Sequence, residues 1–86
     1  MKLKKELISR EIAGERFLVP VGKSVYDANG LFILTDVGAF IWDLLPNVDN
    51  QEQILSAVLT EYQVDEETAK KDITEFLQKL ADLEII

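Results

Sequence analysis

Carboxylates are the most numerous side chains that could carry out chemistry in this 86-residue chain, with 16 Asp and Glu against nine Lys and Arg. There is no histidine and no cysteine, which removes the usual proton-transfer group at neutral pH, the commonest metal ligand and the thiolate nucleophile. The densest acidic cluster is Asp65, Glu66 and Glu67, where a helix cap and the helix dipole already account for negative charge. No Asp-x-Asp-x-Asp-Gly calcium loop is present. We therefore predict no catalytic residues, no metal ligands and no cofactor, and hence a protein that is not an enzyme.

Phosphate and nucleic-acid binding are also disfavoured by the sequence. Gly22 and Gly30 are isolated, without the lysine-bearing glycine-rich loop that cradles phosphates. The net charge is −7, and residues 24–69 contain nine acidic residues and no basic one. Binding to DNA relies on lysine and arginine side chains that neutralise phosphates. We expect repulsion from a duplex, and no nucleic-acid partner.

Length and hydropathy indicate one domain over residues 1–86. A chain of this size buries only about 60 to 65% of its unfolded surface, which leaves room for a single modest core. No stretch approaches the roughly 20 apolar residues of a membrane span, and the start of the chain lacks an apolar signal core. We expect a soluble cytoplasmic protein without a membrane partner.

The first third of the sequence has the pattern of β-strands. Residues 7–12 and 16–21 predict a hairpin around the turn Ala13-Gly14, with Pro20 at a strand end or on an unpaired edge. A loop ending in the turn dipeptide Asn29-Gly30 follows. The apolar run from Leu31 to Thr35, rich in β formers, predicts a third strand with apolar side chains on both faces.

Helical periodicity begins after this third strand. Thr35 or Asp36 can cap a helix over residues 37–45 that Pro46 and Asn47 end, and Asp49 or Asn50 can cap a second helix. Asp65 can cap a third helix. Its predicted buried positions are Ala69, Ile73, Phe76, Leu77, Leu80 and Leu83. The order predicts an α+β fold, winged helix-turn-helix-like, with a three-stranded N-terminal antiparallel sheet packed on three C-terminal helices.

In the stretch from Asn29 to Leu45, an apolar strand runs into a helix that carries Gly38-Ala39 and then Ile41-Trp42. This arrangement resembles the centre of proteins of the PqqD-like family. The resemblance continues through Ile54 to Leu59, Val64 to Thr68 and the Asp72-Ile73-x-x-Phe76-Leu77-x-x-Leu80 rhythm, and so covers roughly residues 8–86. Two positions depart from the family: Thr35 often corresponds to Asn, and Pro46-Asn47 often corresponds to Asp-Gly. Both replacements exchange one capping or stopping residue for another.

The resemblance implies a RiPP recognition element, which binds the leader segment of a ribosomally made precursor peptide and presents it to a modifying enzyme such as a radical S-adenosylmethionine protein. In that family the leader adds as an extra strand beside the third strand and lies against the third helix. Carried over residue by residue, the implied peptide-binding residues are Leu31, Phe32, Ile33, Leu34, Thr35, Lys70, Ile73, Thr74 and Leu77. Strand addition requires that the third strand leave one edge unpaired.

Several features have simpler interpretations. The strand from Leu31 to Thr35 could be covered within the fold, and Lys70 and Lys71 could form an ordinary solvated face instead of pairing with an acidic leader. Trp42 could anchor a partner, but its helical spacing favours partial burial in the core. An open strand would also permit a homodimer. The alternative function is an acidic winged-helix protein-interaction or regulatory domain without a peptide substrate.

Overall fold

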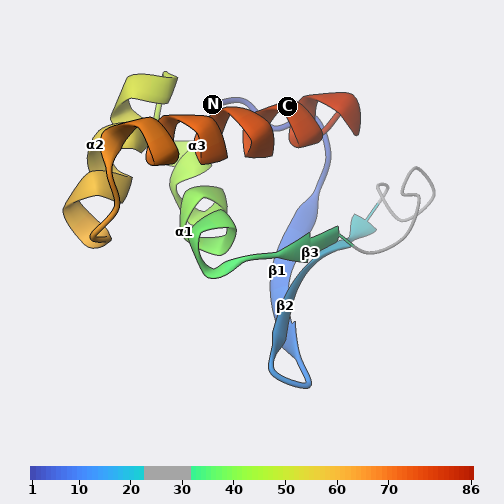
Figure 1. The fold of residues 1–86 in the computed structure, drawn as a ribbon. Coiled ribbons are helices and arrows are strands. Elements are labelled where there is room, and N and C mark those ends of the chain that lie inside the picture. The colour runs from blue at the N-terminus through green and yellow to red at the C-terminus, as the bar shows by residue number, and fades with distance from the viewer. Residues whose placement is uncertain (23–31) are drawn as a thin grey trace.

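The computed structural model describes residues 1–22 and 32–86 of the chain. Within these residues three strands precede the helices: β1 (Leu7–Ile12), β2 (Glu15–Pro20) and β3 (Phe32–Leu34) (Figure 1). The helices are α1 (Asp36–Leu44), the 3-10 helix η2 (Leu45–Asn47), α2 (Gln51–Glu61) and α3 (Glu66–Asp82). The predicted order of three strands and three α-helices is confirmed, as is the α+β fold. The predicted loop at Asn29-Gly30 lies outside the described residues.

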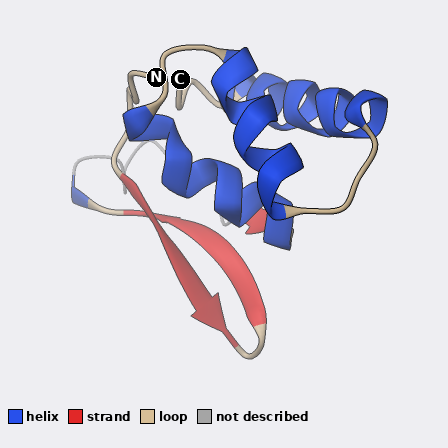
Figure 2. Cartoon of the chain, turned by 90° about the vertical axis from the view of Figure 1, so that its left-hand side faces the viewer, coloured by secondary structure: helices blue, strands red, loops and turns tan. Residues whose placement is uncertain are grey.

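The three strands form one antiparallel sheet in the order β1-β2-β3. β1 and β2 make the predicted hairpin, in which Ile12 is opposite Glu15. Ala13 and Gly14 form the turn with φ of 52° and 82°, and positive φ at both central residues matches the right-handed twist of the strands. β2 ends at Pro20, where the missing N–H removes no interior ladder bond. In both views the turn end of the hairpin projects beyond the helices (Figures 1 and 2).

Side chains cap all three α-helices at their first residues. The Thr35 hydroxyl accepts a hydrogen bond from the Gly38 amide at 3.0 Å, and Asn50 accepts one from the Gln53 amide at the same distance. Asp65 caps α3. Because proline is tolerated in the first turn of a helix, the chain does not stop at Pro46 but winds through η2 to Asn47.

One hydrophobic core lies between the sheet and the helices. Among the described residues, seven large side chains are fully buried, and of these only Leu18 comes from the sheet. Trp42 is buried, which places it in the core. Leu83 was predicted to be buried but is 39% exposed, because α3 ends at Asp82 and the chain turns at Glu84, where φ is 59°. Ile85 fills the core in its place.

The two chain ends meet on the helical side of the molecule (Figure 1). The Lys4 amide donates to the Ile85 carbonyl at 2.7 Å, and the Lys5 ammonium donates to the Leu83 carbonyl at 2.8 Å. The terminal amino group of Met1 donates to the carbonyls of Leu45 and Val48. The segment before β1 thus ties the end of α3 to the sheet. Among the described residues, no helix has the length and hydropathy to cross a membrane.

Candidate peptide-binding groove

The feature that sequence analysis required, an open edge of the third strand, is present. Among the described residues β3 pairs with β2 alone, with Phe17 opposite Ile33 and Leu18 opposite Phe32. Alternate residues of an edge strand direct their N–H and C=O groups away from the neighbouring strand, where another chain can bind them. β3 ends at Leu34, one residue earlier than predicted, because Thr35 serves as the cap of α1. The predicted first residue of the strand, Leu31, lies outside the described residues.

A cavity of about 340 Å³ lies beside this edge and is bounded by β3, α1 and α3. Its walls are apolar and its rim is charged, and every charged group of the rim comes from α3. The lining residues are Phe32, Ile33, Leu34, Thr35, Val37, Gly38, Ile41, Asp72, Glu75, Phe76 and Lys79. An apolar hollow with few polar groups is the usual form of a ligand site, and this one is at the small end of the range. It has room for an anchoring side chain beside a strand.

Alternation along β3 decides which side chains face this groove. Leu34 is 6% exposed and Phe32 is half-buried, whereas the Ile33 side chain is 64% exposed. Successive side chains of a strand point to opposite faces of the sheet. Phe32 and Leu34 therefore point toward the helices and the groove, and Ile33 points to the outer face.

Phe76 of α3 is the centre of the groove. Its ring meets that of Phe32 edge to face, with ring centroids 6.1 Å apart and planes at 70°. On the α1 side, a Cβ atom added to Gly38 would lie 3.4 Å from Cε1 of Phe76 and 3.2 Å from the Thr35 hydroxyl. Glycine in a helix interior costs about 0.5–1 kcal/mol relative to alanine, and the close approach of Phe76 is a reason for it here. Gly38 leaves space that a side chain would occupy.

The structure separates the two halves of the predicted peptide-binding residues. Phe32, Ile33, Leu34 and Thr35 line the cavity, whereas Lys70, Ile73, Thr74 and Leu77 do not. The residues of α3 that line the cavity are instead Asp72, Glu75, Phe76 and Lys79. Their spacing of three, four and seven residues puts them on one face of the helix. The sequence shows this spacing, but it does not show on which side of α3 the strand β3 lies.

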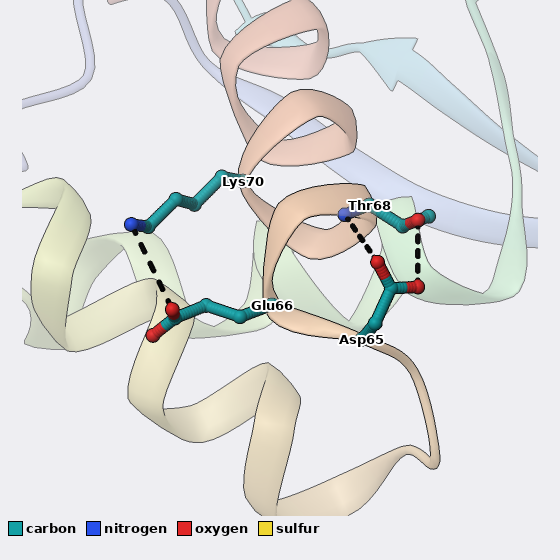
Figure 3. Close-up of polar contacts among 4 residues, drawn as sticks. All are labelled: Asp65, Glu66, Thr68 and Lys70. Carbon is teal, nitrogen blue, oxygen red and sulfur yellow. Dashed lines mark hydrogen bonds and ion pairs between the residues drawn. The ribbon is translucent and has the colours of Figure 1, made fainter.

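The predicted residues of α3 have other neighbours. Ile73 is 0% exposed and belongs to the hydrophobic core. The Thr74 hydroxyl accepts a hydrogen bond from Gln51 of α2 at 2.8 Å. Leu77 packs against the core. The Lys70 ammonium lies 3.9 Å from the Glu66 carboxylate, an exposed ion pair within α3 (Figure 3).

Asp65 at the start of α3 has the capping role that the sequence predicted. Its carboxylate accepts hydrogen bonds from the Thr68 hydroxyl at 2.8 Å and the Thr68 amide at 3.3 Å (Figure 3). The hydroxyl first, and then the amide, hold the pKa of Asp65 below its ordinary value of 3.8, since both bonds favour the ionised form. No group of three or more potential metal-ligating side chains gathers in the described part of the chain.

Sheet, helix order and groove together define an α+β domain of the winged helix-turn-helix-like class. The chain belongs to the PqqD family, because the model of the family described as coenzyme PQQ synthesis protein D matches residues 15–86. It is also similar to the solved structure of TbiB1 in complex with the TbiA(beta) leader peptide. The two chains are 33% identical with a TM-score of 0.71, over 99% of this chain and 93% of TbiB1. No curated protein sequence matches significantly.

Proposed function

We propose that this protein binds the leader segment of a ribosomally made precursor peptide by adding it as a strand at the edge of β3. The observation that carries this proposal is the unpaired β3 edge, among the described residues, next to an apolar cavity. The family and the similarity to a protein solved with a leader peptide support it. The chain is then a RiPP recognition element.

Backbone groups and side chains contribute differently to such binding. The guest backbone pairs with the outward N–H and C=O groups of β3, which contributes affinity for almost any extended sequence. Alternate guest side chains turn toward α3, and one of them fills the apolar cavity against Phe32 and Phe76. The cavity therefore selects the sequence that the strand edge holds.

The protein itself carries out no bond chemistry in this proposal. Its role is to bring substrate and enzyme together, because a bound leader holds the rest of the precursor near a modifying enzyme, such as a radical S-adenosylmethionine protein. Tethering turns the second encounter into an intramolecular one, which raises the effective concentration of substrate without a new contact to the reacting residue.

Leader segments of short peptides encoded beside the gene for this chain are the probes for a direct test. Each is titrated into isotope-labelled protein while backbone amide resonances are followed. We expect saturable shifts at Phe32, Ile33 and Leu34, with hydrogen exchange slowed most at those whose N–H groups face the free edge, and smaller changes at the Ala13-Gly14 turn. Shifts that cluster on the hairpin or on α2, with β3 unchanged, would show that the peptide binds elsewhere.

A further inference from the structure

The charged residues at the rim of the groove follow one another along α3, with two carboxylates before one lysine. Asp72, Glu75 and Lys79 are exposed, and within residues 1–22 and 32–86 none of their side chains has an ion-pair partner. Lys79 lies in the last turn of α3, where the helix dipole favours a cation. Asp72 and Glu75 lie in the helix interior, where neither a cap nor the dipole accounts for them.

These charges are spread along the length of the groove. At a rise of about 1.5 Å per residue, Asp72 and Lys79 are about 10 Å apart along the axis of α3, with Glu75 between them. β3 and α3 run in opposite directions across the groove (Figure 1). The Thr35 end of β3 therefore lies toward the two carboxylates, and the Phe32 end lies toward the ammonium of Lys79. One end of the groove is negative and the other is positive.

The direction of the guest strand determines the order in which its side chains meet these charges. The sheet is antiparallel throughout the described residues, and antiparallel pairing is the slightly more stable kind. A guest that pairs antiparallel to β3 enters at the Thr35 end and leaves at the Phe32 end. Its groove-facing side chains, two residues apart, are spaced by about 6.6 Å and so meet the carboxylates, the apolar cavity and Lys79 in turn.

We propose that the leader recognised here carries, from its N-terminal side, a basic residue, then an apolar anchor, then an acidic residue, at alternate positions. This inference rests on the proposed strand addition and goes beyond it, because it states the substrate class. The charge of the surrounding domain agrees with a basic residue as the first contact: residues 32–86 hold 12 acidic and three basic residues, a net of −9. Complementary charge selects partners and register more than it adds affinity.

The test is a selection from one random peptide display library on three baits. The first is the wild-type protein, and the second is Asp72→Lys/Glu75→Lys/Lys79→Glu, in which the rim order is reversed. The third, Glu66→Lys, is a control outside the groove. Both variants change the net charge from −7 to −5, so they differ only in where the charge changes. Thermal unfolding of each bait establishes that it is folded.

We expect wild type and Glu66→Lys to enrich basic-x-apolar-x-acidic peptides, and the reversed rim to enrich acidic-x-apolar-x-basic peptides. An enriched peptide should bind its own bait about 3–10-fold more tightly than the other rim, the size expected for a few exposed ion pairs. Selection of the same apolar peptides by all three baits, without charge order, would overturn this inference and leave the proposed function standing. Selected peptides that leave the β3 amides unshifted would overturn both.

Discussion

The two flanks of α3 both carry exposed charged side chains but have different surroundings. On one flank, Thr74 is hydrogen-bonded to Gln51 of α2 and Lys70 pairs with Glu66. The other flank, with Asp72, Glu75 and Lys79, borders the cavity next to the free edge of β3. Both flanks border the same buried stripe of Ala69, Ile73 and Leu80. The elements packed around α3 decide which of its flanks borders the groove, and the sequence of α3 alone does not show which flank that is.

Proline at Ile33 should have the largest effect on the groove side. Ile33→Pro removes a ladder donor from β3 and fixes φ, so we expect leader binding to weaken by about 100-fold or more. Isothermal calorimetry measures the loss, and circular dichroism establishes that the variant is folded. Ile33→Thr is the matched control, because it keeps the N–H and a β-branched side chain and should bind nearly as wild type does. Full binding by a folded proline variant would exclude strand addition at β3.

Two neighbouring half-buried side chains of α3 offer the sharpest comparison of its flanks. Phe76→Ala removes the ring at the centre of the groove, and we expect leader affinity to fall by about 10–30-fold. Leu77→Ala removes a side chain outside the cavity and should leave affinity within about twofold. Both should lower the free energy of unfolding by about 1–3 kcal/mol, since each leaves a partial cavity. Equal losses of binding, measured by fluorescence anisotropy, would show that the groove has no preferred flank.

Filling the space at Gly38 should have a smaller effect. Gly38→Ala puts a methyl group 3.2 Å from the Thr35 hydroxyl and 3.4 Å from Phe76, at the lining of the cavity. We expect affinity to fall by about 2–5-fold while stability changes by less than about 1 kcal/mol, because the gain in helix propensity offsets the tight contacts. Calorimetry and urea unfolding of the same variant measure the two quantities. Tighter binding would mean that the guest does not reach the α1 wall.

Asp65 should make a pH-dependent contribution to the stability of the protein without affecting the groove. Its pKa is lowered in the folded protein, so its contribution is fully present above the unfolded value of 3.8 and is lost as pH falls through the folded pKa. Asp65→Asn keeps the cap without the charge. The stability difference between wild type and Asp65→Asn should be constant above about pH 5, and wild type should lose stability relative to the variant as pH falls through 3.8 toward the folded pKa, as followed by urea unfolding. A difference that varied near pH 7 would contradict this assignment.

Local signals in the sequence were sufficient for most of the fold. The structure confirms the turn at Ala13-Gly14 and the cap at Asp65, both predicted from short spacings. For the other two helices the sequence offered two neighbouring candidates each, and the structure selects Thr35 and Asn50. The prediction that Leu83 is buried was wrong, because it extended the helical periodicity past the end of α3. The chain reverses at Glu84 and brings Ile85 into the core instead. A helix end that depends on a backbone turn has only a weak sequence signal.

The site was predictable in part for the same reason. β3 was recognisable as an apolar run between a turn and a cap. The sequence left open whether this strand is covered within the fold, and the strand order of the described residues places it at the sheet edge. The helix side of the groove depends on how α3 lies across β3, which is a tertiary relation. Asp72, Glu75 and Lys79 therefore looked like any solvated helix face, and Phe76 looked like core.

Alternate N-methylation of a bound leader peptide tests the central claim most directly, because it removes backbone donors from the guest and leaves the protein unchanged. If the leader pairs with β3, methylation at every second position should abolish binding measured by calorimetry. Methylation at the intervening positions, whose N–H groups point away from β3, should leave affinity within a few-fold. Equal tolerance at both sets of positions would show that the guest is held by its side chains alone and does not join the sheet.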